Sequence, residues 1–309
     1  MHLLRRLRPS DASNLSELRR RTGATAKAPA GLSIAVLLMD NLQNSVSSAT
    51  RLRVALRLRE LDVFHKITTI LAIESGSRAW GFPSRDSDYD IRFIYARPIS
   101  GYLTLSQGRD VIEVPLDTNG WDIAGWDLRK TLFLALRSNA TVGEWLTSPI
   151  AYATVPALVG AMLTFLREQY SPRRYALHYF HLAHKYWRER AAGRSNVTDK
   201  TYCYVFRSLL ATLWTITRRD LVPMNIDDLL AGVEVPVKVG EAFNAVRLRK
   251  IDSLEKTILG REPILDGWII DLLNSLKPVC YALPDREPDW PAGDQLFRWI
   301  LKYLKDGNE

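Results

Sequence analysis

Cysteine and long apolar runs are both scarce in this sequence of 309 residues. The two cysteines, Cys203 and Cys280, form no C-x-x-C pair. Such sparse use predicts reduced thiols in a cytoplasmic protein, with a single disulfide as the alternative. The longest uncharged apolar run, Leu32 to Met39, is far below the roughly 18 to 20 residues of a membrane span. We therefore expect neither a transmembrane segment nor a membrane partner.

Several enzyme motifs are also missing. The sequence has no G-x-x-x-x-G-K-[ST] loop, no G-x-S-x-G elbow and no G-x-G-x-x-G fingerprint. These absences argue against a P-loop NTPase, an α/β-hydrolase and a dinucleotide-binding fold, respectively.

Acidic residues are few at the start of the chain. Residues 1–60 contain 11 basic and 4 acidic residues, whereas the other residues contain 31 and 30. The high isoelectric point of about 9.5 therefore comes from one end and is weak evidence for nucleic-acid binding. We predict that residues 1–48 form a disordered basic extension. It is an inert tail, a basic arm for nucleic acid, or the product of a start site upstream of Met39.

Hydrophobic patterning predicts an α+β fold, with a small mixed sheet and flanking helices in residues 49–150 and an all-helical domain in residues 151–309. The first helix starts near Thr50, with Leu52, Leu56 and Phe64 as its apolar positions and arginines between them. The strands are expected at 67–73, 91–95, 111–115 and 121–123. Later helices are expected at 127–137, 155–169, 172–192, 198–219, 238–251, 263–275 and 294–305, with a proline-rich loop over 278–293.

The segment between the first two strands carries the clearest chemistry. Strand 67–73 ends at a Ser75-Gly76-Ser77 turn, whose backbone N–H groups and hydroxyl suit phosphate oxygens. Asp88 and Asp90 open the next strand, where residues two apart face the same side. Two such carboxylates repel each other unless a cation lies between them, and hard oxygen ligands suit Mg²⁺.

This combination resembles the DNA polymerase β-like nucleotidyltransferase superfamily, whose signature is G-S, about ten residues, then D-x-D. The string ESGSRAWGF followed by SDYDIRF is similar to one branch, the predicted nucleotidyltransferases that include the RNA-ligase-associated protein. The resemblance extends through GWDLRK at 125–130 and EWL at 144–146 and covers about residues 50–275. It implies that Gly76 and Ser77 grip a triphosphate and that Asp88 and Asp90 hold two metal ions.

The superfamily mechanism also implies a third carboxylate on a neighbouring strand. Asp122, between Trp121 and Ile123, is our first choice. The alternatives are Asp127, which a helix cap would also explain, Glu113 and Asp117.

Other residues are candidates for nucleotide binding. Arg78 could pair with a phosphate or form a salt bridge to Asp86 or Asp88. Lys200, Tyr204 and Arg207 share one helix face, which is either a nucleotide contact or a solvated basic surface. The remaining candidates are His178 as a pocket residue, Trp80 and Phe82 as turn packing or base stacking, and Glu74 as a positioning group.

The sequence therefore predicts a Mg²⁺-dependent nucleotidyltransferase, with Mn²⁺ as an alternative metal. It would transfer a nucleoside monophosphate from a nucleoside triphosphate such as ATP to an acceptor hydroxyl and release pyrophosphate. RNA or tRNA is the favoured acceptor by analogy with RNA repair, and protein or a small molecule stays open. The alternative is an inactive fold that binds RNA or protein.

Overall fold

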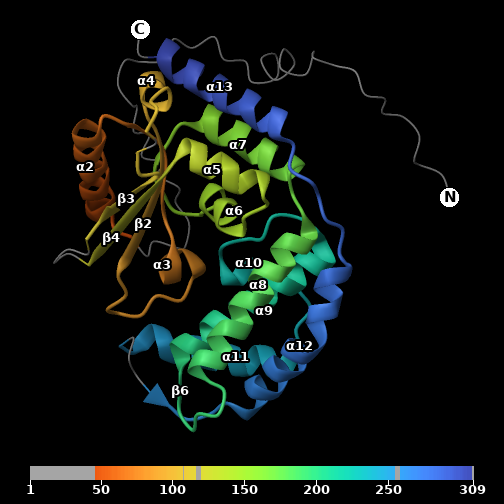
Figure 1. Cartoon of the computed structure of the whole chain (residues 1–309). Coiled ribbons are helices and arrows are strands. Elements are labelled where there is room, and N and C mark those ends of the chain that lie inside the picture. The colour runs from red at the N-terminus through yellow and green to blue at the C-terminus, as the bar shows by residue number, and fades with distance from the viewer. Residues whose placement is uncertain (1–45, 107, 116–119, 255–257, 308–309) are drawn as a thin grey trace.

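The computed structural model describes residues 46–106, 108–115, 120–254 and 258–307. Residues 1–45 of the predicted extension and the alternative carboxylate Asp117 lie outside the described residues. The sheet with its covering helices forms one half of the molecule, and a group of long helices forms the other (Figure 1).

A five-stranded mixed sheet is the centre of the first half, as predicted. Its strands follow the order β3-β4-β2-β1-β5. β2 and β4 are parallel, and the other neighbouring pairs are antiparallel. The bounds are β1 (Thr68–Glu74), β2 (Tyr89–Ala96), β3 (Val111–Val114), β4 (Trp121–Asp127) and β5 (Ala151–Thr154). β5 completes an edge of the sheet just beyond position 150, so the sheet extends into the region that we expected to be helical.

Helix α2 (Ser48–His65) covers one face of the sheet (Figure 1). Its buried positions are Val54, Ala55, Leu58 and Leu61. All of them except Ala55 join a core cluster that includes residues of the strands, and the helix packs on β1 and β5. Their spacing of three and four residues places them on one side of the helix. Ser47 caps the helix, since its hydroxyl accepts a hydrogen bond from the Thr50 N–H at 3.1 Å.

The helix was expected here, but the prediction of which face is buried was wrong. Leu52, Leu56 and Phe64 are 58%, 52% and 80% exposed. The segment has apolar residues on more than one side, and periodicity alone cannot say which side meets the sheet. The packing of α2 against β1 and β5 decided it.

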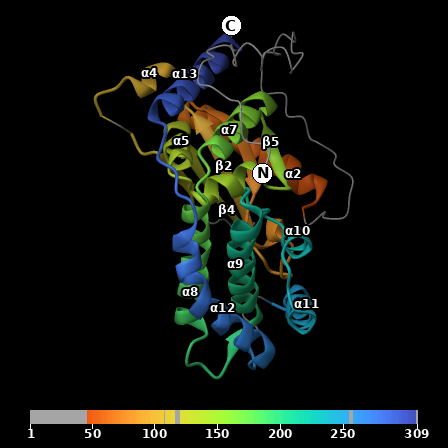
Figure 2. The same ribbon diagram turned by 90° about the vertical axis from the view of Figure 1, so that its right-hand side faces the viewer.

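The opposite face of the sheet is covered by α5 (Leu128–Leu136), α6 (Ala140–Leu146) and α7 (Pro156–Glu168). The last helix, α13 (Trp290–Asp306), packs on α5 and α7. Figure 2 shows it near the sheet, away from the far end of the helical half. The C-terminal helix therefore contributes to the sheet half, which the sequence did not indicate.

The helical half is built around α8 (Pro172–Arg190) and α9 (Asp199–Arg218), which pack along each other. They are joined by α10 (Ile226–Gly232), α11 (Val237–Asp252) and α12 (Pro263–Ala282). The smaller elements are α3 (Gly76–Trp80), α4 (Ile99–Tyr102) and the two-stranded pair β6 (Val197–Thr198) and β7 (Ile258–Leu259).

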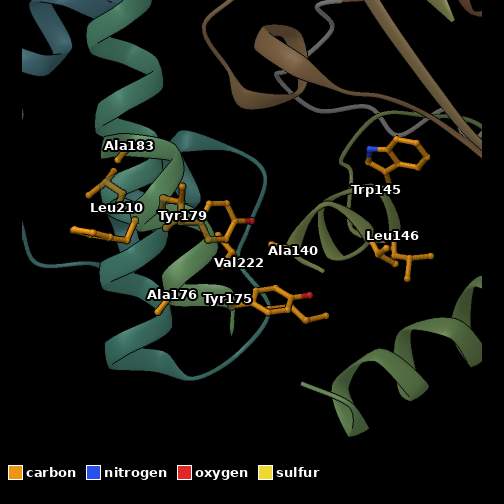
Figure 3. Packing of buried hydrophobic residues seen from close by; sticks show 14 of the residues in the cluster. Ala140, Trp145, Leu146, Tyr175, Ala176, Tyr179, Ala183, Leu210 and Val222 are labelled. Carbon is orange, nitrogen blue, oxygen red and sulfur yellow. The ribbon is translucent and has the colours of Figure 1, made fainter. Parts of the chain in front are cut away.

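The two halves share one hydrophobic core. The same cluster of buried residues includes Ile73 of β1, Trp145 of α6 and Tyr179 of α8. Figure 3 shows Tyr175 and Tyr179 projecting from α8 toward Ala140 at the start of α6. Because the cluster is continuous, the helical half is packed against the sheet half.

The predicted loop over 278–293 is shorter in the structure. α12 continues through Pro278 to Ala282, and α13 begins at Trp290. A proline inside a helix costs about 3 kcal/mol. Burial of Leu276, Cys280 and Leu283 around it offsets this cost.

Cys203 and Cys280 are buried and unpaired, as the reduced-thiol prediction required. Burial raises the pKa of Cys280 to about 11. No helix in the described part of the chain has the length and apolar character needed to cross a membrane.

The shared core predicts one unfolding transition that is sensitive to the helical half. Phe206 is fully buried, and its ring stacks on Phe243 with 3.9 Å between centroids. Phe206→Ala should lower the free energy of unfolding by about 3 to 5 kcal/mol and shift the whole transition in thermal denaturation. Phe64→Ala, at a position 80% exposed, should change it by less than about 0.5 kcal/mol. Equal effects of the two substitutions would contradict the assignment.

Candidate active site

The candidate site lies at the edge of the sheet where β1 ends and where β2 and β4 begin. β2 and β4 are parallel, with Asp90 directly opposite Asp122. Register partners in a sheet point to the same face. Asp122 therefore lies on the strand neighbouring Asp90, as predicted for the third carboxylate.

Asp88 lies at the same edge, just before β2. Its Oδ1 is 3.4 Å from the point where a Cβ on Gly120 would be, and Gly120 directly precedes β4. The Tyr89 N–H donates to the Gly120 carbonyl at 2.8 Å. Burial raises the pKa of the Asp90 carboxyl, the Arg92 guanidinium lowers it, and the charges of Asp122 and Asp88 raise it. The three carboxylates thus form one acidic edge.

Gly76 is in contact with the Asp90 carboxylate. A Cβ at Gly76 would lie 1.9 Å from Asp90 Oδ2, and its φ is +61°. Both the close approach and the left-handed backbone exclude a larger residue. The glycine of the G-S pair thus has a demonstrable local role, which is to let the backbone after β1 meet the second aspartate of D-x-D.

Arg92 bridges Asp90 and Asp122. Its Nη2 donates to Asp90 Oδ1 at 3.0 Å and to Asp122 Oδ2 at 2.7 Å. Its Nη1 donates to the carbonyls of Asp122 and Ile91, at 2.7 and 3.1 Å. Sequence reasoning missed this residue, although the alternation of β2 places positions 90 and 92 on one face.

The carboxylates do not form a compact metal cluster as they stand. In the ranges that the structure describes, no three Asp, Glu, His or Cys side chains converge closely enough to ligate one ion. The same statement covers His178, His181 and His184 of α8.

Two alternative carboxylates have other partners. Asp127 caps α5, since its Oδ1 accepts from the Arg129 N–H at 2.8 Å, and it also pairs with Arg97 at 3.3 Å. Glu113 lies on β3 and binds Arg109 at 3.1 Å. Of the carboxylates weighed for the third position, Asp122 has the register pairing with Asp90.

Glu74 is hydrogen-bonded to the backbone of Asp90. It is fully buried, and its Oε1 accepts a hydrogen bond from the Asp90 N–H at 3.1 Å. Its Oε2 accepts from the Tyr152 hydroxyl at 2.6 Å. Burial raises the pKa of Glu74 to about 7, against these hydrogen bonds, which lower it. Its contact with the Asp90 backbone agrees with the predicted positioning role.

The expected turn at Ser75–Ser77 is instead the start of the short helix α3. The Ser77 hydroxyl is buried and donates to Ser87 Oγ at 3.2 Å, so its side chain joins the two parts of the segment. Arg78 donates to the carbonyls of Ser87 and Asp88 at 2.6 and 3.2 Å and lies 4.0 Å from the centre of the Tyr89 ring.

Two cationic side chains of α11 bind the backbone just after α3, at the end of the segment that begins with Gly76. Lys250 is 1% exposed, and its Nζ donates to the Phe82 carbonyl at 2.7 Å. Arg247 donates to the Gly81 carbonyl at 2.9 Å and also pairs with Asp227. The helical half therefore helps position the G-S segment, through two residues that were not among the candidates selected from the sequence.

The predicted face of α9 turns toward Trp80. The Tyr204 ring contacts Trp80 edge-on with 4.9 Å between centroids, and Lys200 Nζ is 5.6 Å from the Tyr204 ring centre. Arg207 is 2% exposed, pairs with Glu144 at 2.9 Å and lies over Trp80 at 4.6 Å. This face is therefore not a solvated surface throughout, and the charge of Arg207 is already paired.

A cavity of about 390 Å³ adjoins the acidic edge, between the sheet and α8 and α9. It is lined by Arg92 and Ser75 from the edge and by groups from both halves. Its aromatic walls include Trp126 and Trp145, which stack with 4.0 Å between centroids. The other lining residues include Trp80, Glu144, His178, Tyr186, Tyr204 and Arg207. Burial lowers the pKa of His178, which favours the neutral imidazole.

The mixed sheet, the G-S segment against the D-x-D pair and the helices that follow are arranged as expected for a polymerase β-like nucleotidyltransferase. The comparison with known families specifies the branch. The chain belongs to the RNA repair pathway DNA polymerase beta family, whose model matches residues 50–299. A curated relative, the uncharacterized protein YcgL of Bacillus subtilis (strain 168), is 38% identical over 254 residues, or 82% of this chain and 96% of that protein.

The contact between Gly76 and Asp90 can be tested against a matched glycine. Gly81 also has a positive φ, +88°, but its nearest neighbour is Asn225 at 3.1 Å. Gly81→Ala should cost about 1 to 3 kcal/mol of backbone strain. Gly76→Ala should cost a further 1 to 3 kcal/mol, roughly, from overpacking against the carboxylate. Urea denaturation measures both, and equal losses would contradict the contact.

Glu74 should make stability depend on pH. Its pKa is raised from 4.5 to about 7 in the folded state, so the folded state binds an extra proton between these values. The stabilisation is therefore present at low pH and is lost as the pH rises through about 7, by about 3 kcal/mol in all. Glu74→Gln removes the titration. Relative to wild type, the variant should gain that stability between about pH 4 and pH 8 in urea unfolding, and a difference independent of pH would refute this.

Proposed function

We propose that this protein is a Mg²⁺-dependent nucleotidyltransferase that moves a nucleoside monophosphate from a nucleoside triphosphate to an acceptor hydroxyl. The observation that carries the proposal is the register pairing of Asp90 with Asp122, beside a Gly76 that contacts Asp90 Oδ2 too closely for any side chain. Two carboxylates are placed together next to the segment that the family uses for the triphosphate. Membership of the RNA repair pathway DNA polymerase beta family supports the reaction class.

The donor atoms fit the proposed metal. Asp88, Asp90 and Asp122 offer hard oxygen ligands of the kind that Mg²⁺ and Mn²⁺ prefer. The guanidinium of Arg92 already bridges two of them, so Asp90 and Asp122 can share one positive charge. When bound, the metal ions would supply neutralisation of the phosphate charge.

The chain's own groups would position the substrates. The backbone of Gly76 and Ser77 would hold the triphosphate, with Arg78 and Lys200 as nearby cations. The base would enter the aromatic cavity near Tyr204, because that cavity opens beside Ser75 and Arg92. The acceptor oxygen would bond to the α-phosphorus as the bond to pyrophosphate breaks, and the hydroxyl proton would pass to Asp122.

An RNA acceptor, including tRNA, is the form of the proposal that the family description favours. The basic side of α2 reaches the acidic edge, because the Arg53 guanidinium lies 5.0 Å from the Trp121 ring centre. Trp121 directly precedes Asp122. Successive residues of a strand face opposite sides, so a polyanion on α2 would lie at the same end of β4 as the Asp122 carboxylate but on the other face of the sheet. Transfer to protein or to a small molecule, and the preferred nucleotide, are outcomes of the assay below.

A second candidate is an inactive fold that binds RNA or protein. The observation in its favour is Arg92, which supplies a counter-charge to Asp90 and Asp122 from within the chain. Titration calorimetry separates the two functions. Nucleotide binding that requires Mg²⁺ supports the transferase, and RNA binding indifferent to Mg²⁺ supports the binding module.

The transferase proposal predicts a labelled product that depends on the acidic edge. Purified protein is incubated with each α-labelled nucleoside triphosphate, Mg²⁺ and total cellular RNA, protein or small molecules. Asp88→Asn with Asp90→Asn should reduce labelling by more than about 100-fold, because even groups that only orient metal ligands cost 10- to 100-fold. Asp110→Asn, an exposed carboxylate at the opposite end of β4, should keep it. Unchanged labelling in the double variant would refute the proposal.

A further inference from the structure

We infer that Arg92 is an internal counter-ion that the metal displaces and that then binds the phosphates of the nucleotide. This inference rests on the proposed function and goes beyond it, since the G-S and D-x-D signature does not include position 92 and the resemblance assigns no role to the arginine of SDYDIRF. The starting point is the set of four hydrogen bonds that Arg92 makes at the acidic edge.

The guanidinium and a bridging metal ion need the same oxygen atoms. Nη2 uses Asp90 Oδ1 and Asp122 Oδ2 at 3.0 and 2.7 Å. A divalent ion shared by these carboxylates would take those lone pairs, and it would repel a guanidinium left between them. Arg92 is 19% exposed as a side chain, so this repulsion would be only partly screened by water. Metal binding and the Arg92 bridge therefore compete.

The cavity beside the acidic edge is open to a displaced Arg92 guanidinium. Arg92 lines the 390 Å³ cavity that also opens on Ser75, the residue before the G-S pair. A planar guanidinium binds phosphate oxygens in a two-point geometry that a lysine cannot reproduce. Leaving the carboxylates for the cavity would bring Arg92 toward a triphosphate held at Gly76 and Ser77. It follows that bound metal should raise the affinity for the nucleotide, and bound nucleotide should raise the affinity for the metal.

The test uses Arg92→Gln and opposite changes in two affinities. Without nucleotide, Mn²⁺ should bind the variant about tenfold more tightly than wild type, a factor that corresponds to about 1.4 kcal/mol, by calorimetry or by electron paramagnetic resonance. With saturating Mg²⁺, a non-hydrolysable nucleoside triphosphate should bind it about tenfold more weakly. A residue that only shaped the site would weaken both.

Lys200→Gln is the matched control. Lys200 acts on the Asp90 charge through space, so its loss removes one positive charge from the same region. It should tighten Mn²⁺ binding by less than about twofold. Arg92→Lys, which keeps the charge without the planar fork, should fall between wild type and Arg92→Gln in both affinities, and it serves as the second variant if Arg92→Gln unfolds.

Two outcomes would overturn the inference: equal Mn²⁺ affinities of Arg92→Gln and Lys200→Gln, or weaker Mn²⁺ binding by both Arg92 variants. Either would leave the proposed function intact as long as wild type binds Mn²⁺ and nucleotide. If wild type binds neither, the proposed function fails, and the inference fails with it.

Discussion

The parallel pairing of β2 with β4 is the constraint on which the candidate site depends. It places Asp90 opposite Asp122 on one face of the sheet, and two carboxylates at that spacing require positive charge between or beside them. Arg92, two residues along the same strand, supplies it within the chain. The divalent cation that we propose would use the same oxygen atoms that Arg92 neutralises within the chain.

The surroundings of Asp90 explain why small changes there should be poorly tolerated. Gly76 contacts its carboxylate from one side, and Glu74 holds its backbone N–H from another. Glu74 is in turn bonded to Tyr152 of β5, the strand at the far edge of the sheet. The Asp90 side chain is thus positioned by the close approach of the Gly76 backbone and by the buried carboxyl group of Glu74.

The helical half is part of this arrangement. Lys250 and Arg247 of α11 bind the carbonyls of Phe82 and Gly81, at the end of the segment that begins with Gly76. Arg207 and Glu144 form a buried pair across α9 and α6, beside the cavity. Buried ion pairs of this kind are expensive to break by removing one partner. A movement of the helices relative to the sheet would therefore shift the backbone of the G-S segment, because α11 is hydrogen-bonded to it. These contacts physically couple the two halves.

The local pattern of the sequence by itself determined the α+β class, four strands of the sheet, most of the long helices, and the G-S and D-x-D pair, because periodicity and strand alternation act over a few residues. A short apolar-Asp-apolar run also made Asp122 the first choice for the third carboxylate, and this residue is the register partner of Asp90. Only the tertiary structure decided which side of α2 is buried, that α12 runs through Pro278 and that α13 returns to the sheet half. It likewise decided that Arg92 lies between Asp90 and Asp122. Those outcomes depend on contacts between residues far apart in the chain, where several local solutions satisfy the sequence and the shared core selects one.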